Sequence, residues 1–216
     1  MRRILLLAFL FGIAMTQTGS TQSKTVEIDL AGMTIGQAPA GFAFAKTGGG
    51  RPPHWIVAAD SGASGGRAIA QTDTDRTDNR FPLAIYQPLM AKNVEVSARF
   101  KPVAGRVDQA AGLVVRLQGP NDYYIARANA LEDNVRFYRV VNGRREQLAT
   151  ANLKVASGVW HTLALKAEDD RFTVTFDGRE LYTARDAIFA GAGRVALWTK
   201  ADSVTHFDTI KITPLN

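Results

Sequence analysis

Apolar and polar residues alternate along most of the chain after residue 50. The segments VEVSARF (94–100), TLALK (162–166) and FTVTF (172–176) each place an apolar residue at every second position. A period of two puts the apolar side chains on one face of a strand, and no window carries a sustained helical stripe with capping residues. The pattern predicts an all-β protein whose antiparallel sheets have one buried face and one wet face.

Turn signals divide these segments at short intervals. Asn142-Gly143 separates RFYRVV from RREQLAT, and Asp177-Gly178 separates RFTVTF from RELYTA. Both pairs supply the positive φ that a two-residue hairpin needs, and GPND (119–122) marks another turn. The spacing predicts about 12 to 14 short strands, which fit two packed sheets better than a small barrel.

The N-terminus has the layout of a secretory signal peptide. Two arginines precede an apolar run in MRRILLLAFLFGIAM (1–15), and the polar stretch TQTGSTQS follows. The apolar run is too short to span a bilayer stably, although an uncleaved anchor is the alternative. We predict a signal peptide over 1–22, one domain over 23–216, no membrane span after cleavage, and a periplasmic or secreted protein.

Composition excludes several classes of function. The chain has no cysteine, which rules out a lipid-anchored cysteine, thiol nucleophiles and thiolate metal sites. The formal charge of +6 falls to +4 when Arg2 and Arg3 leave with the signal peptide. The remaining basic residues are interspersed with acidic ones, so the basic stripe of a nucleic-acid-binding protein is missing. The sequence leaves the oligomeric state open.

Three runs carry a resemblance to a known superfamily. They are GLVVRLQGPNDYYIARANALEDNVRFYRVVNG, GVWHTLALKAEDDRFTVTFDGRELY and GRVALWTKADSVTHFDTIKI. In this order, over residues 66–213, they resemble the exported bacterial branch of the concanavalin A-like lectin/glucanase superfamily, close to laminin G-like jelly rolls and to 3-keto-disaccharide hydrolase domains. The resemblance implies a jelly-roll β-sandwich of two antiparallel sheets.

The chain departs from the enzymes of that superfamily. Its glucanases carry E-x-D-x-x-E on one strand, whereas the E-x-D at Glu27-Ile28-Asp29 is followed by glycine at position 32. The opening pattern of the hydrolase domains is missing as well. The pattern G-x-S-x-G around Ser64 lacks the strand and helix that a nucleophile elbow requires, which favours a turn. Hydrolase activity is therefore implied by the resemblance alone.

One aromatic residue lies on the face where an antiparallel sheet is expected to be wet. In GRVALWTK (193–200), Trp198 shares a face with Arg194 and Lys200, opposite Val195 and Leu197. An indole flanked by cations can bind the apolar patch of a sugar ring. The alternative is that Trp198 and Tyr138 cover a sheet edge and that the arginines are ordinary solvated residues. The predicted ligand-binding residues, on one concave sheet, are Arg116, Arg127, Asn129, Arg136, Tyr138, Trp198 and Lys200.

Two carboxylates lie in the loop between the strands that carry Arg127 and Arg136. Glu132 and Asp133 are the candidate acid and base if the domain is catalytic. A structural role is the alternative, because short polar side chains often bond the backbone of their own turn.

A second acidic loop is a candidate calcium site. Asp73, Asp75 and Asp78 supply hard oxygen donors within QTDTDRTDNRFP (71–82). The alternative is a solvated loop that Arg76 and Arg80 neutralise. The three histidines, His54, His161 and His206, are too scattered to form a ready metal motif.

These features favour an exported, lectin-like domain that binds carbohydrate on its concave sheet. Two other functions remain open: a glycoside hydrolase or lyase acting on 3-keto-glycosides, and a laminin G-like adhesion module. A shallow aromatic groove would indicate the carbohydrate-binding domain, and converging carboxylates would indicate the enzyme. A flat apolar patch would indicate the adhesion module.

Overall fold

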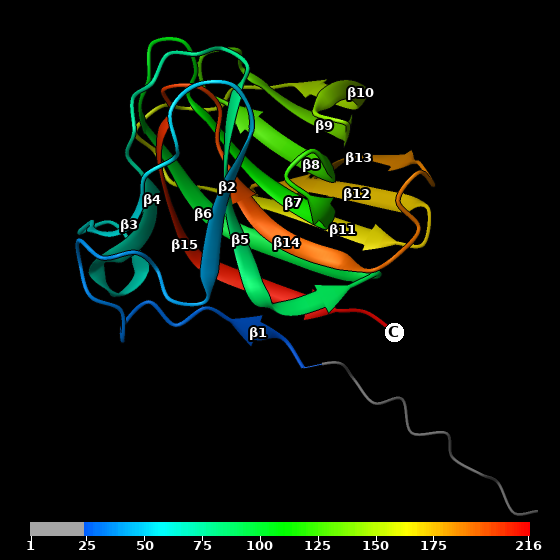
Figure 1. Ribbon diagram of the computed structural model, residues 1–216, viewed down its shortest axis with the longest axis horizontal. Coiled ribbons are helices and arrows are strands. Elements are labelled where there is room, and N and C mark those ends of the chain that lie inside the picture. Colours follow the sequence, from blue (N-terminus) through cyan, green and yellow to red (C-terminus); the bar gives the residue numbers. More distant parts are fainter. Residues whose placement is uncertain (1–23) are drawn as a thin grey trace, which may run out of the picture.

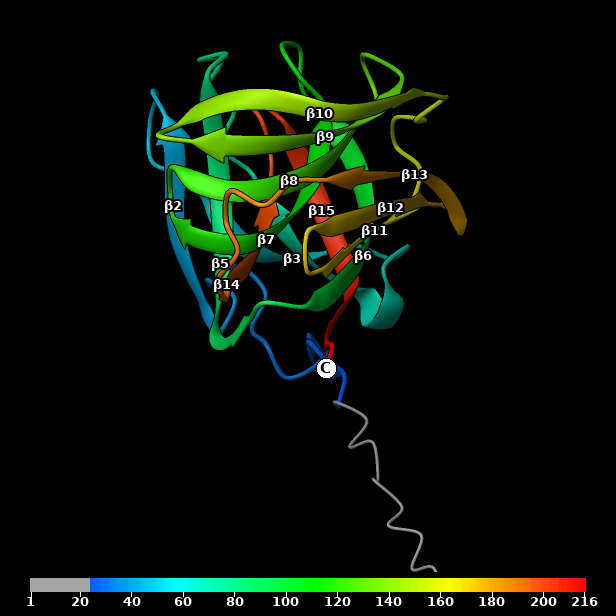
Figure 2. The ribbon, with the colours of Figure 1, turned by 90° about the vertical axis from the view of Figure 1, so that its right-hand side faces the viewer.

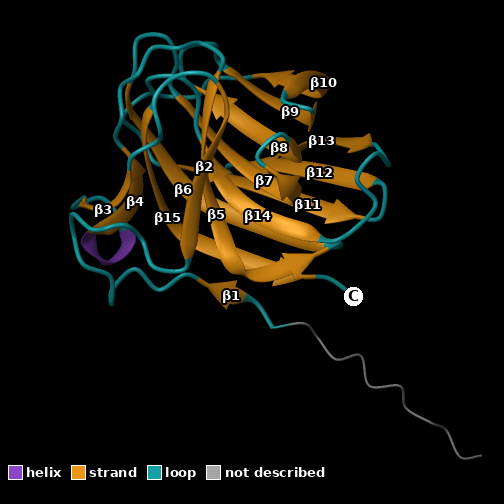
Figure 3. Ribbon diagram, viewed as in Figure 1, coloured by secondary structure: helices purple, strands orange, loops and turns teal. Residues whose placement is uncertain are grey.

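The computed structural model describes residues 24–216, so the predicted signal peptide lies outside the described residues. Strands make up most of the described chain (Figure 3), together with one short 3-10 helix, η1 (Ser64–Gly66). None of the helices in this part is long and apolar enough to cross a membrane.

The strands form two antiparallel sheets (Figure 1). The eight-stranded sheet has the order β13 (Arg179–Arg185), β12 (Arg171–Phe176), β11 (His161–Glu168), β6 (Val94–Ala104), β15 (Val204–Pro214), β4 (Arg67–Gln71) and β3 (Trp55–Ala59), and β1 (Val26–Glu27) also pairs with β15. The seven-stranded sheet has the order β10 (Arg144–Asn152), β9 (Asn134–Val141), β8 (Asp122–Asn129), β7 (Ala110–Gly119), β14 (Gly193–Trp198), β5 (Arg80–Ala91) and β2 (Phe42–Gly48). This architecture confirms the predicted jelly-roll sandwich.

The predicted hairpins are also confirmed. Asn142 and Gly143 have φ values of 50° and 77° and join β9 to β10. Asp177 and Gly178, at 46° and 77°, join β12 to β13 in the same way. The described residues contain slightly more strands than the spacing predicts, in part because two-residue β1 is too short to show any period.

The eight-stranded sheet has the single buried face that alternation predicts. Along β6, β11 and β12, buried residues alternate with partly exposed ones. Val96, Leu165 and Val174 lie in the main core between the sheets, with exposures of 1% or less. Their polar neighbours in sequence face outward, as a half-solvated antiparallel sheet requires.

The central strands of the seven-stranded sheet are buried on both faces, and here the expectation of one wet face is wrong. All residues of β8 after Asp122, and the first eight residues of β7, are buried. One face belongs to the main core. The other face, called the concave face below, carries a second core. The second core consists of Phe81, Leu83, Ile85, Ala110, Val114, Leu117, Tyr123, Ile125, Tyr138, Val140, Ala196 and Trp198.

This face is concave because the sheet curls on itself. In Figure 2, β8, β9 and β10 run across the view while β2 and β5 run down it. The Thr47 hydroxyl of β2 lies 2.8 Å from the Tyr123 hydroxyl of β8, although three strands separate β2 from β8 in the sheet. In a flat sheet these strands would lie about 19 Å apart. The curl therefore brings the two ends of the sheet together and removes the concave face from water.

A glycine makes room for the largest side chain of the second core. Gly112 of β7 pairs with Trp198 on one side and with Arg127 on the other. A Cβ atom on Gly112 would lie 2.8 Å from Ile125 Cδ1 and 3.1 Å from Trp198 Cε3. The indole packs over this position and stacks on Phe81, with ring centroids 5.5 Å apart and planes 13° apart.

The outer face of the eight-stranded sheet is tied to a neighbouring loop by a charged network. Asp60 accepts a hydrogen bond from Lys101, and its Oδ2 lies 2.7 Å from Nδ1 of His206. Although burial raises the pKa of Asp60, hydrogen bonds from Lys101 and His206 lower it to about 2. The folded state therefore stabilises the ionised carboxylate.

We expect Trp198→Ala to lower the free energy of unfolding by about 3–5 kcal/mol, because the substitution empties the centre of a core. Urea denaturation followed by circular dichroism measures the change. Ile188→Ala is the control, since Ile188 is 52% exposed, and it is expected to change stability by less than about 0.5 kcal/mol. An equally small effect of Trp198→Ala would show that the concave face does not depend on this residue.

We also expect the Asp60 network to weaken in acid. A lowered carboxylate pKa stabilises the fold above the ordinary value of 3.8, and this contribution is lost as the pH falls towards 2. Allowing for solvent screening, it amounts to about 1 kcal/mol. Asp60→Asn should therefore be less stable than the parent at pH 6 (about two units above the ordinary pKa), and the difference should shrink in acid. A difference that does not change with pH would contradict this.

Candidate functional site

The face assignment from sequence holds for most of the predicted ligand-binding residues. Arg127 pairs with Arg136 across β8 and β9, and Gly112 lies between Arg127 and Trp198 in register. Tyr138 belongs to the same second core as Trp198. These residues therefore share the concave face.

The accessibility expected for the aromatic residues is wrong. Trp198 is fully buried and Tyr138 is 7% exposed, so neither presents an open platform to a sugar ring. The physical reason is the curl of the sheet, which stacks Phe81 of β5 on the indole. Arg145 of β10 in turn covers Phe81, with its guanidinium carbon 4.3 Å from the ring centroid.

Arg116 does not join this face, which corrects its predicted position. Its φ of 51° lies at an irregularity in the pairing of β7 with β8, where the register shifts between Val115 and Gly119. The side chain lies over the ring of Phe172 of the main core, at 5.0 Å. Its guanidinium donates hydrogen bonds to the carbonyls of Lys92, Asp169 and Phe189. Arg116 thus fixes loops at the sandwich edge.

Three arginines gather around Tyr138 and Glu132 on the concave face, and we call Arg127, Arg136 and Arg145 the arginine cluster. The guanidinium carbons of Arg127 and Arg145 lie 5.8 and 5.1 Å from the Tyr138 ring centroid. Arg127 donates to Asn134 Oδ1 and to Glu132 Oε2, both at 2.8 Å. Arg136 reaches the same carboxylate oxygen at 3.4 Å. One carboxylate therefore serves two guanidinium groups.

Several donors of the arginine cluster have no partner. Nε of Arg127, Nε of Arg136 and Nη1 of Arg145 are buried and make no hydrogen bond within the described part of the chain. Arg145 also lies beyond ion-pair distance of every described carboxylate. Burial lowers the pKa of Arg145, and the positive charge of Arg127 acts in the same direction. Arg136 keeps 33% of its side chain exposed, so the cluster opens to solvent.

Asn129 and Lys200 form a second polar group at the end of the same face. Asn129 Nδ2 donates to Asp108 Oδ1 at 2.6 Å, and Lys200 Nζ lies 2.8 Å from Asp108 Oδ2. Lys200 also pairs with Asp78 at 2.7 Å. Burial raises the pKa of Asp108, while Lys200 acts in the opposite direction. Both predicted ligand-binding residues are thus already engaged by carboxylates.

The structure does not pair Glu132 with Asp133 as an acid and a base. Glu132 belongs to the arginine cluster, and although burial raises its pKa, hydrogen bonding from Arg127 lowers it overall. Asp133 instead accepts hydrogen bonds from Lys154 and the Val155 amide, and the Lys154 contact lowers its pKa. The two carboxylates serve different segments, and Asp133 bonds a neighbouring loop instead of the backbone of its own turn.

The candidate calcium loop does not gather its carboxylates around one point. Asp73 pairs with Arg51 and Arg80, and Asp75 accepts hydrogen bonds from the Arg51 and Thr77 amides. Asp78 pairs with Lys200. Over residues 24–216, no group of three or more His, Asp or Glu side chains could hold a metal ion. Arg80 neutralises the loop as the alternative expected, whereas Arg76 lies nearest Asp202, at 3.9 Å.

The histidines remain apart and have local partners. Nδ1 of His54 bonds the Thr72 hydroxyl, and Nδ1 of His161 bonds Asp177. His206 bonds Asp60 as described above. Each contact ties neighbouring segments together.

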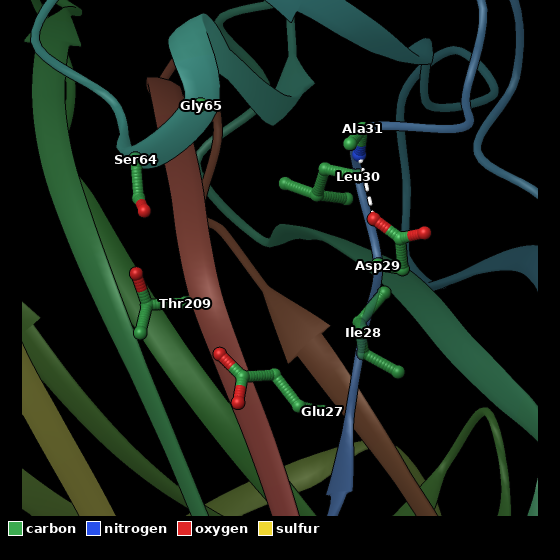
Figure 4. Close-up of a pocket in the computed structure, with 8 residues that line it drawn as sticks. All are labelled: Glu27, Ile28, Asp29, Leu30, Ala31, Ser64, Gly65 and Thr209. Carbon is green, nitrogen blue, oxygen red and sulfur yellow. Dashed lines mark hydrogen bonds between the residues drawn. The ribbon is translucent and has the colours of Figure 1, made fainter.

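A separate pocket of about 360 Å³ lies between β1, η1 and β15 (Figure 4). The hydroxyls of Ser64 and Thr209 point towards one another, and the carboxylate of Glu27 lies near them (Figure 4). Asp29 on the opposite wall accepts a hydrogen bond from the Ala31 amide. Ser64 begins η1 after a turn rather than lying between a strand and an α-helix, so it does not form a nucleophile elbow.

Arg145 is absent from the predicted ligand-binding residues, although the sequence contains a signal for it. A two-residue turn at Asn142-Gly143 pairs residue 141 with 144 and residue 140 with 145, which is the observed register. Arg145 must then share a face with Val140 and Tyr138. The covering of Trp198 had no comparable signal, because it depends on contacts between strands far apart in the sheet.

No family model matches the chain, and no curated protein matches it. Solved structures do resemble it. The carbohydrate binding module CBM66 from Bacillus subtilis is 22% identical, with a TM-score of 0.59 over 78% of this chain and 94% of that chain. Domain 4 of AbnA, a GH43 extracellular arabinanase from Geobacillus stearothermophilus in complex with arabinotriose, is 14% identical, with a TM-score of 0.57 over 89% and 93%.

A Bacillus licheniformis beta-glucanase is likewise 14% identical, with a TM-score of 0.56 over 91% of this chain and 100% of that chain. At these identities the similarity concerns the fold. Together with the two antiparallel sheets and their order, it identifies the chain as having the concanavalin A-like jelly-roll fold.

Proposed function

We propose that this chain binds carbohydrate at the arginine cluster on the concave face. The observation that carries the proposal is the set of guanidinium N–H groups that lack partners, on Arg127, Arg136 and Arg145, next to the partly exposed side chain of Arg136. Buried donors are normally satisfied, so a group of unsatisfied donors at a solvent opening fits a ligand with acceptor oxygens. Saccharides supply many such oxygens.

The fold supports the same proposal. Two proteins with similar structures are, by their names, a carbohydrate binding module and an arabinanase domain in complex with arabinotriose. The second of these belongs to an extracellular enzyme, which agrees with the export that the N-terminal residues predict. Because the sequence identities are low, these two structures support the proposal through their shared fold alone.

In this proposal the aromatic residues support the site instead of stacking on the ligand. Tyr138 holds the guanidinium groups of Arg127 and Arg145 near its ring, and Trp198 fills the core beneath. Glu132 orients Arg127 and Arg136 through one shared oxygen. Such support keeps the donors in place before the ligand arrives, which lowers the entropy cost of binding. Asn129 and Lys200 hold the neighbouring loop through Asp108.

We expect Arg136→Gln to weaken oligosaccharide binding by about tenfold, because it removes a charged donor from the open side of the site. Isothermal titration calorimetry of the purified chain, against ligands found on an array of neutral and acidic oligosaccharides, measures the change. The stability of the variant should stay near that of the parent, since Arg136 is only partly buried.

Arg179→Gln is the matched control, because Arg179 is an exposed arginine on β13 of the other sheet. It should bind as the parent does. An array on which the parent chain binds none of the oligosaccharides would contradict the proposed function, and equal losses in both variants would contradict the proposed site.

A further inference from the structure

The charges of the arginine cluster do not balance. Three guanidinium groups face one carboxylate, that of Glu132, and the charged groups nearby reduce this positive excess without cancelling it. Lys200 pairs with both Asp108 and Asp78, and this group therefore adds one net negative charge, which leaves the face net positive. Arg194, which shares the concave face through its place on β14, has no ion pair with any described carboxylate and leaves its buried Nε without a partner.

Within the arginine cluster, Arg145 is the member without a carboxylate partner. Its guanidinium makes no ion pair and no hydrogen bond with the described residues, and it lies over the rings of Phe81 and Tyr138. A partly buried cation without a counter-charge is unfavourable, and contacts with aromatic faces offset only part of that cost. A charged group kept in such a place marks a candidate site for a ligand of the opposite charge.

We propose that the ligand of this site is an anionic saccharide, with a carboxylate or a sulfate group that pairs with Arg145. This inference rests on the proposed function, since it names the class of carbohydrate. A guanidinium group presents parallel N–H donors that match two oxygens of a carboxylate or sulfate. Neutral sugars offer hydroxyl oxygens and would leave the net positive charge uncompensated.

The neighbours of Arg145 suit this role. Phe81 and Tyr138 restrict the guanidinium, which lies 4.3 and 5.1 Å from their ring centroids. Arg145 thereby has few alternative positions, and its loss of freedom on binding is small. Arg136 lies on the adjoining strand and contributes a second positive charge with an accessible side chain.

The test compares matched charged and neutral ligands. Calorimetric titrations use two pairs of ligands, each with one backbone and two charge states. One pair is oligogalacturonate and its methyl ester, and the other is sulfated dextran and dextran. The first pair reports on carboxylate and the second on sulfate. We expect at least one charged ligand to bind about tenfold or more tightly than its neutral counterpart, with an affinity that falls as salt is raised.

Arg145→Met is the informative variant. Methionine keeps an apolar stem against Phe81 and Tyr138 and removes an unpaired cation, so we expect the variant to be as stable as the parent or more stable. It should lose about tenfold in affinity for the charged ligand and little for the neutral one. Arg185→Met, which removes an equal charge from an exposed pair with Asp170 on the other sheet, should bind as the parent does.

Each other outcome has a definite meaning. If neutral ligands bind as tightly as charged ones, the anionic preference is wrong while the proposed function stands. If a charged ligand binds and Arg145→Met has no effect, Arg145 is not the recognition residue. If no neutral or charged saccharide on the array or in titration binds, both proposals fail.

Discussion

The curl of the seven-stranded sheet determines what the concave face of this protein can do. Contacts between Thr47 and Tyr123, and between Phe81 and Arg145, join strands that lie far apart in the sheet order. These contacts turn an open face into a second core centred on Trp198. The arginines at its border are held by the same aromatic residues, so their chemistry follows from the packing beneath them.

This arrangement separates two roles that an open sugar-binding sheet would combine. Trp198 and Tyr138 supply packing, and the guanidinium groups supply hydrogen bonding and charge. A site of this kind recognises a ligand mainly by its acceptor oxygens and its charge. Affinity should therefore depend on ionic strength more than it does for a site built on stacking.

Much of the fold could be predicted from the sequence. Alternation in VEVSARF and FTVTF gave the half-solvated strands of the eight-stranded sheet, and the Asn-Gly and Asp-Gly pairs gave two hairpins. Period two also assigned Arg127, Arg136, Tyr138 and Trp198 to one face correctly.

The pattern did not reveal how deeply that face is buried, because burial there depends on side chains from β2, β5 and β10 meeting across the curl. Arg116 was misplaced because a positive φ within β7 reverses the direction that simple alternation assumes.

The most direct test of this account is a crystal structure of the chain with an acidic oligosaccharide. We predict an acidic group of the ligand within hydrogen-bond distance of the Arg145 guanidinium, with Trp198 still buried under Phe81. A ligand stacked on an exposed Trp198, or bound in the pocket between Glu27 and Thr209 with the arginine cluster empty, would contradict it.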